Sequence, residues 1–181
     1  MHILGISGSL RQGSLNTAAL RACAELVPDG VTLSLADLSA VPLYNEDLRT
    51  QGLPQPVLQL REQIRAADAL IIATPEYNYS FPGVLKNAID WASRPPDQPF
   101  DAKPIALIGA TPGGLGTSRA QYQLRQVFVY LNGFLLNKPE VMISAAPSKF
   151  DASGQLIDDT TAENLRKLLS ALCDLVHQRK L

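Results

Sequence analysis

Apolar positions along the chain follow two alternating patterns, one typical of strands and the other typical of helices. Short, nearly continuous apolar runs predict strands, and each run is followed by apolar residues at helical spacing. The predicted strands are 2–6, 31–37, 69–73, 105–110 and 141–144. The predicted helices are 15–26, 57–67, 84–92, 121–131 and 160–177, with a capping box from Thr160 and Glu163 opening the last one. Strand and helix therefore alternate five times.

The second predicted strand differs from the others because its apolar residues strictly alternate. Val31, Leu33 and Leu35 are separated by Thr32 and Ser34, as in a strand with one exposed face. The remaining strands are continuously apolar, which indicates a parallel sheet covered by helices on both faces. With right-handed crossovers and the alternating strand at an edge, the strand order is 2-1-3-4-5. We predict a three-layer α/β sandwich with a five-stranded parallel sheet.

Composition adds the class of protein to this picture. The 181 residues, 46% of them hydrophobic, predict a single domain over 1–181. The net charge of -1 without a basic run predicts no nucleic-acid or anionic-membrane partner. Cys23 and Cys173 lie among apolar residues of predicted helices, so we expect packed, reduced thiols. No signal-peptide pattern and no apolar stretch of about 20 residues occurs, which predicts a cytoplasmic protein.

The first loop of interest, 8–16, lies between the first strand and its helix. Glycines let its backbone approach a ligand, and Arg11 adds a charged fork that matches phosphate. Its side-chain donors are Ser9, Ser14 and Asn16, with Ser7 just before them. A helix N-terminus follows, so we predict an anion site, best filled by a monophosphate. Neither the Walker loop nor the dinucleotide fingerprint is present. The alternative is a serine-rich turn that caps the helix.

A second loop, 74–83, follows the most apolar strand. Two prolines stiffen it, and Tyr77, Tyr79 and Phe81 offer flat apolar surfaces. The amides after Pro75 and the side chain of Asn78 can bind the edge of a heterocycle. This combination suits an isoalloxazine ring. The alternative is an ordinary loop whose aromatic rings pack on a neighbour.

A third loop, 109–119, is rich in glycine and follows the fourth strand. It can line the other side of a flavin or the entrance for a dinucleotide, or it can be a flexible turn. In an open α/β sheet the loops at the carboxyl ends of strands share one crevice, so we expect all three loops to converge.

The sequence contains few candidate residues for acid–base catalysis or metal binding. The only two histidines, His2 and His177, lie at opposite ends of the chain. No cluster has metal-ligand spacing, and no Ser-His-Asp set is plausible. We therefore predict neither a metal site nor a catalytic side chain. A phosphate site without such residues favours a protein whose cofactor carries the chemistry.

The two loops together resemble a known family. The segments GSLRQGSLN (8–16) and PEYNYSFPGVLKNAIDWASR (75–94) are similar to the flavodoxin-like NAD(P)H-dependent FMN reductases, especially the bacterial soluble quinone and chromate reductases. AQYQLRQVF (120–128) and NKPE (137–140) fit the same subgroup. The resemblance implies a flavodoxin-like fold, FMN as cofactor and NADPH or NADH as reductant. It also implies a ping-pong route to quinones, free flavin, azo compounds or chromate.

By position, the resemblance also implies which residues contact the cofactor. The phosphate group would be held by Ser9, Arg11, Ser14, Leu15 and Asn16. The isoalloxazine would lie along Pro75, Glu76, Tyr77 and Asn78, with Thr111 and Gly113 approaching from the third loop. The alternatives to a reductase are a flavodoxin-type electron carrier, which would be strongly acidic, and a non-catalytic protein of the same fold.

Members of this family are dimers or tetramers, and this chain has a segment that would suit an interface. The run 127–131 (VFVYL) is apolar nearly all round one predicted helix. Arg119, Tyr122 and Glu140 are candidates for polar contacts across a subunit boundary. Ordinary core packing and surface charge are the alternative. We expect a homodimer or homotetramer.

Overall fold

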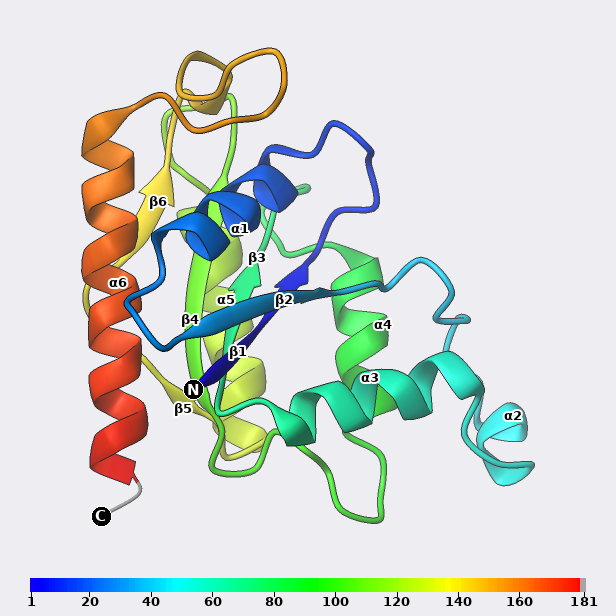
Figure 1. Cartoon of the computed structure of the whole chain (residues 1–181). Helices are drawn as coiled ribbons and strands as arrows, with labels where there is room; N and C mark the ends of the chain where they lie inside the picture. The colour runs from blue at the N-terminus through cyan, green and yellow to red at the C-terminus, as the bar shows by residue number, and fades with distance from the viewer. Residues whose placement is uncertain (180–181) are drawn as a thin grey trace.

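The strands of this computed structural model, which describes residues 1–179, form one parallel sheet. They are β1 (His2–Ser7), β2 (Thr32–Ala36), β3 (Ala69–Ala73), β4 (Pro104–Ala110), β5 (Phe134–Leu135) and β6 (Val141–Ile143). The order is β2-β1-β3-β4-β5, with β6 also paired to β4 (Figure 1). The predicted order is therefore confirmed, with the alternating strand at the edge. Leu35 of this edge strand stays 38% exposed.

The fifth position of the sheet is divided between two short strands. β5 pairs with the start of β4 through Pro104 and Phe134. β6 pairs with the end of β4, where Ile108 lies opposite Val141. Both lie on the edge of β4 that faces away from β3. The sequence predicted only the second of these strands, because β5 has two residues and no periodicity of its own.

Helices cover both faces of the sheet (Figure 1). One face carries α1 (Leu15–Leu26) and α6 (Asp159–Arg179), whose buried residues form one core cluster with the sheet. The other face carries α3 (Gln55–Ala66), α4 (Gly83–Ala92) and α5 (Ser118–Tyr130) around a second cluster. The layers agree with the predicted three-layer sandwich. None of the helices within 1–179 is long and apolar enough to cross a membrane.

The start of α6 differs from its prediction. The predicted capping box at Thr160 and Glu163 is wrong, because Asp158 caps the helix instead. Its Oδ2 accepts from the backbone N–H of Thr161 at 3.1 Å and from the Thr161 hydroxyl at 3.0 Å. Glu163 faces Lys167 one turn later, at 3.5 Å. Asp158 therefore satisfies the amide three residues after the cap, which is also the amide that the serine or threonine of a capping box satisfies.

The long connection after β2 is docked on α4 rather than free. It contains the short helix α2 (Glu46–Thr50). Trp91 Nε1 and Asn87 Nδ2 both donate to the carbonyl of Pro42 at 2.8 Å. The ring of Tyr44 packs edge-on against Trp91, with the centroids 4.7 Å apart. These contacts hold the connection beside the second and third turns of α4.

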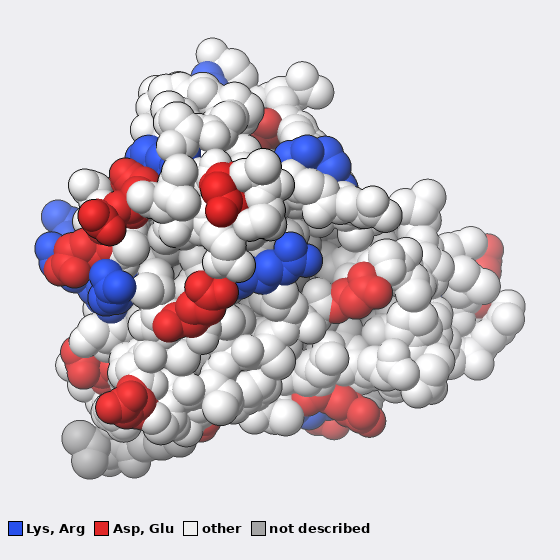
Figure 2. Space-filling model, turned by 45° about the horizontal axis from the view of Figure 1, so that its top comes forward, with Lys and Arg blue, Asp and Glu red and all other residues white. Residues whose placement is uncertain are grey.

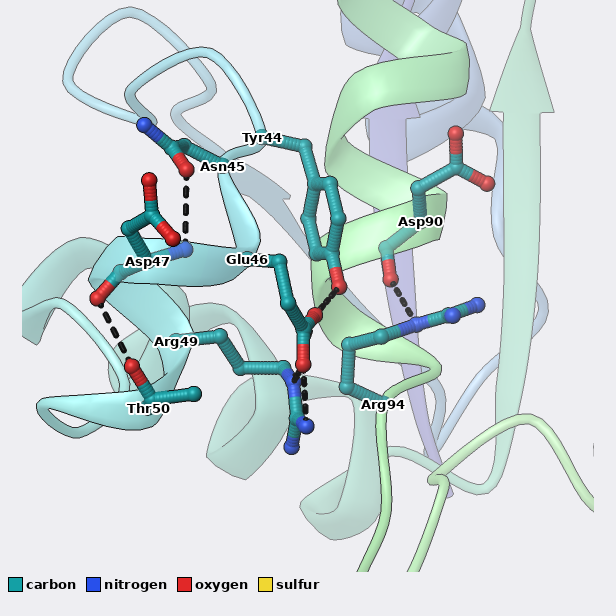
Figure 3. Close-up of polar contacts among 8 residues, drawn as sticks. All are labelled: Tyr44, Asn45, Glu46, Asp47, Arg49, Thr50, Asp90 and Arg94. Atoms are coloured by element: carbon teal, nitrogen blue, oxygen red, sulfur yellow. Dashed lines mark hydrogen bonds and ion pairs between the residues drawn. The ribbon is translucent and has the colours of Figure 1, made fainter.

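A cluster of polar side chains at the surface reinforces this docking (Figure 3). Glu46 pairs with Arg49 and accepts a hydrogen bond from the hydroxyl of Tyr44. The Arg49 and Tyr44 hydrogen bonds lower the pKa of Glu46 to about 2. Arg94 lies over the Tyr44 ring, 5.7 Å from its centroid. The carboxylate therefore stays ionised and ties α2 to the tyrosine that contacts α4.

Both cysteines are free thiols packed in the core, as predicted. Burial raises the pKa of the Cys23 thiol to about 12, and it also raises the pKa of Cys173. Since the thiolate is the reactive form, neither cysteine is poised for chemistry at neutral pH.

Candidate functional site

The three loops predicted to converge do meet at the carboxyl ends of β1, β3 and β4. They enclose a cleft of about 170 Å³. Its lining residues are Ser9, Arg11, Ser14, Leu15, Asn16, Pro75, Glu76, Tyr77, Ala110, Thr111 and Pro112. Nine predicted site residues are in this lining, while Asn78 and Gly113 are not. Ala110 and Pro112 were not predicted, because they contribute only backbone and an apolar ring.

The N-terminus of α1 forms one end of the cleft. Ser14 is the N-cap, and its Oγ accepts from the N–H of Thr17 at 3.3 Å. Within residues 1–179 no acceptor satisfies the N–H groups of Leu15 and Asn16. Helix starts of this kind attract anions, because free amides and the positive end of the helix dipole act together. The cleft therefore has a ready anion site.

Arg11 adds a permanent positive charge beside these amides. The backbone of this loop turns so that the N–H of Ser14 donates to the carbonyl of Arg11 at 3.1 Å. No carboxylate of the described residues forms an ion pair with Arg11. Its guanidinium is exposed and free for an external anion. A fork of this geometry suits a phosphate group.

The side chain of Asn16 is used inside the protein. Its Nδ2 donates to the carbonyl of Ala110 at 3.0 Å, and its Oδ1 accepts from the N–H of Ala110 at 2.9 Å. Asn16 is 4% exposed, so this pair of bonds is buried. The side chain thus joins the start of α1 to the end of β4. Only the backbone N–H of Asn16 remains for a ligand.

The first and second loops are packed tightly through a glycine. The N–H of Gly8 donates to the carbonyl of Ala73 at 2.8 Å. A Cβ at Gly8 would lie 3.1 Å from Pro82 Cγ and 3.2 Å from Pro75 Cδ. A larger residue would therefore push the two loops apart. The missing side chain of Gly8 therefore serves the contact between the two loops rather than the approach of a ligand.

The second loop contains a tight turn. The backbone groups of Tyr77 and Ser80 exchange hydrogen bonds of 2.8 and 3.0 Å. Between them, Asn78 and Tyr79 have φ values of 51° and 70°, as in a type I′ turn. Asparagine tolerates this conformation well, which explains its presence at position 78. Asn78 thus shapes the loop and does not line the cleft, whereas its predicted role was contact with the ring.

Glu76 connects the second loop to the third and to α5. Its carboxylate pairs with Arg119 and accepts from the N–H of Ala120 at 3.3 Å. The Glu76 side chain is 9% exposed. The guanidinium of Arg119 lies over the ring of Tyr79, 3.7 Å from its centroid. One guanidinium and one backbone amide therefore hold the carboxylate in a structural role, between the second loop and α5.

The third loop opens a second cavity next to the cleft. This cavity has a volume of about 280 Å³ and shares Glu76 and Thr111 with the cleft. Gly113 lies here, together with Leu115, Thr117 and Arg119. Thr111 is fixed in position because its N–H donates to the carbonyl of Ile143 at 3.0 Å. The third loop can therefore contact a flat ligand that extends beyond the cleft.

The cleft fits a phosphorylated flavin. Free amides and Arg11 lie at one end, and the rigid second loop offers backbone and an aromatic side chain at the other. The only ionisable side chains in its lining are those of Arg11, Glu76 and Tyr77. Because Glu76 is held by Arg119, the described residues of the cleft are arranged to bind and orient a flavin rather than to transfer protons.

Comparisons with known proteins agree with this geometry. The sequence model of the NADPH-dependent FMN reductase family matches residues 1–148. An NAD(P)H-dependent FMN reductase of Pseudomonas aeruginosa is 61% identical over 170 residues, covering 94% of this chain and 92% of the relative. A quinone reductase of Escherichia coli is 40% identical over 184 residues, covering 100% and 98%. The solved structure of FerB, a flavoenzyme NAD(P)H:(acceptor) oxidoreductase from Paracoccus denitrificans, has a TM-score of 0.89 at 34% identity and covers 98% of both chains.

The Asn16 tether predicts a specific loss of stability. Asn16→Ala removes two hydrogen bonds and leaves the buried N–H and C=O of Ala110 without partners. We expect the free energy of unfolding in urea to fall by about 2–4 kcal/mol. Asn164→Ala, which removes an exposed asparagine of α6, is the matched control. An Asn16→Ala protein as stable as this control would contradict the role of the tether.

Proposed function

The chain belongs to the NADPH-dependent FMN reductase family, and we propose that it passes reducing equivalents from NAD(P)H through bound FMN to quinones. One observation carries the proposal: three loops meet around a helix start with two free amides and an unpaired arginine. The quinone acceptor is supported by the E. coli quinone reductase, which matches the whole chain. Free flavin, azo compounds and chromate are further acceptors that the site would admit in a ping-pong route.

The N-terminus of α1 would hold the FMN phosphate. The free N–H groups of Leu15 and Asn16 point out of the helix, and the Ser14 hydroxyl lies beside them. Arg11 would neutralise charge on the phosphate, and Ser9 would supply a further hydroxyl. Charged hydrogen bonds of this kind are stronger than neutral ones. These residues would therefore control how tightly FMN is retained.

The second and third loops would position the ring. Pro75, Glu76 and Tyr77 line the cleft, Thr111 faces it from the third loop, and Gly113 lies in the adjoining cavity. The ion pair between Glu76 and Arg119 keeps both loops in place. When bound, the flavin supplies the two-electron chemistry. The chain itself binds, orients and leaves one face open to nucleotide and acceptor in turn.

A steady-state assay tests this function. FMN-loaded protein is mixed with NADPH or NADH and benzoquinone, and nucleotide oxidation is followed. We expect continuous turnover without a second protein, because donor and acceptor use the same open face in succession. A protein that binds FMN but turns over only with a partner reductase would be an electron carrier. A protein that stays colourless after incubation with FMN would be neither a flavin reductase nor a flavin electron carrier.

We also propose that the enzyme is a homodimer or homotetramer. On α5, Val129 and Tyr130 are 78% and 89% exposed, a large apolar surface for a free helix end. The polar residues first considered for an interface have partners within the chain: Arg119 pairs with Glu76, and a hydrogen bond to Glu140 raises the pKa of Tyr122. The exposed pair Val129 and Tyr130 is therefore the support for an oligomer.

The free, buried thiols fit a reducing, cytoplasmic location.

Light scattering after size exclusion measures the assembly directly. At micromolar concentration we expect a mass of two or four times 19.6 kDa. Val129→Asp with Tyr130→Ser should shift the mass toward the monomer, since charge and polarity oppose burial. A wild-type protein that elutes as a monomer of 19.6 kDa would refute the proposal.

A further inference from the structure

A separate cavity of about 320 Å³ lies on the far side of the first loop from β3. It is enclosed by the first loop, the outer face of α1 and residues 35–39 at the end of β2. We call it the β2 pocket. It shares Ser9 and Arg11 with the flavin cleft, so the two cavities meet along one wall. A ligand in the β2 pocket would therefore lie next to a flavin held in the cleft.

The β2 pocket carries an excess of positive charge. Arg21 lies on α1 one turn after Thr17, and both residues face this pocket. No carboxylate of residues 1–179 pairs with Arg21 or with Arg11. Charged side chains elsewhere on the top of the molecule are interspersed in small groups of both signs (Figure 2). Arg11 also lines the flavin cleft, so Arg21 is the arginine that favours a further anionic group such as a phosphate in this pocket.

The single acid of the pocket is already occupied. Asp37 Oδ1 accepts from the N–H of Ser39 at 2.8 Å, and its Oδ2 accepts from the Ser39 hydroxyl at 2.9 Å. These bonds lower the pKa of Asp37 and keep it ionised. The charged side chains of the lining are Arg11, Arg21 and Asp37. Because both Asp37 oxygens accept hydrogen bonds from Ser39 and Arg11 serves the flavin phosphate, Arg21 is the charged donor left for a second phosphate.

An apolar wall completes the pocket. Leu10 and Leu35 are 54% and 38% exposed, and both line this cavity. Leu38 forms the floor and is buried. Covering exposed leucines with a flat apolar ring removes their surface from water and favours binding. A ring beside a phosphate, next to a flavin cleft, describes the adenosine end of a nicotinamide nucleotide.

We propose that the β2 pocket binds the adenosine 2′-phosphate of NADPH, and that Arg21 selects NADPH over NADH. The inference rests on the proposed function, because the nicotinamide half must reach a flavin that is held in the adjoining cleft. Arg11 stands on the shared wall and serves the flavin phosphate. Arg21 lines only the β2 pocket, so its effect is confined to the nucleotide that carries the extra phosphate.

Binding of 2′,5′-ADP to FMN-loaded protein tests the proposal by titration calorimetry, with 5′-AMP as the probe that lacks the phosphate. Arg21→Ala should weaken 2′,5′-ADP binding about tenfold, as expected for one charge-assisted contact, and leave 5′-AMP binding unchanged. Arg21→Lys should recover part of the loss. Asp37→Asn, which keeps the turn with Ser39, should strengthen 2′,5′-ADP binding. Arg166→Ala, an exposed arginine of α6 outside the pocket, should change nothing.

The same variants separate failure of the inference from failure of the proposed function. Arg21→Ala should lower kcat/KM for NADPH about tenfold while the FMN content and kcat/KM for NADH stay at wild-type values. If 2′,5′-ADP affinity is unchanged by Arg21→Ala, or falls equally with Arg166→Ala, the β2 pocket is not the site. If wild-type protein neither retains FMN nor reduces benzoquinone with NADH, the proposed function itself is wrong.

Discussion

The start of α1 is held at the carboxyl edge of the sheet by the Asn16 side chain, which bonds both backbone groups of Ala110. The contact joins residues that are 94 positions apart, and it is buried. Because of it, two free amides and the Ser14 cap face the space between three loops. The anion site and its distance from the second and third loops therefore depend on this one tether.

The remaining loops are held in position by contacts that complement the tether. Gly8 allows the first loop to lie against Pro75 and Pro82. The ion pair of Glu76 with Arg119 fastens the second loop to the start of α5. The carboxylate of the cleft, Glu76, is thus used to hold structure, and Arg11 is left for a ligand. The consequence is a rigid binding surface, on which a cofactor and not a side chain carries electrons.

Much of this arrangement follows from local sequence. The alternating residues of β2 identified the sheet edge, and hence the strand order, because only an edge strand exposes one face in this fold. The serines and Arg11 before α1 predicted an anion site, since those residue types act through chemistry that does not depend on distant partners. Family resemblance then selected FMN from the possible phosphates.

Other features depend on tertiary contacts that no local pattern contains. β5 exists because β4 offers it an edge, not because Phe134 and Leu135 have a strand pattern. Asn16 and Asn78 both appeared to be ligand donors, yet one bonds Ala110 and the other adopts a left-handed turn. Arg21 reads as an ordinary solvent-facing helix residue until the fold places it opposite Leu35 and Asp37. For β5, Asn16 and Arg21 the role is set by a neighbour distant in sequence, whereas Asn78 takes part in a local turn between Tyr77 and Ser80.

Binding of the flavin through its phosphate at the start of α1 is the interaction on which the proposed function depends. Parallel measurement of FMN and riboflavin dissociation constants tests it directly, because the two ligands differ only in that phosphate. We expect riboflavin to bind at least about a hundredfold more weakly than FMN. Arg11→Ala should reduce this ratio of affinities by weakening FMN binding alone. Equal affinities for FMN and riboflavin would contradict it.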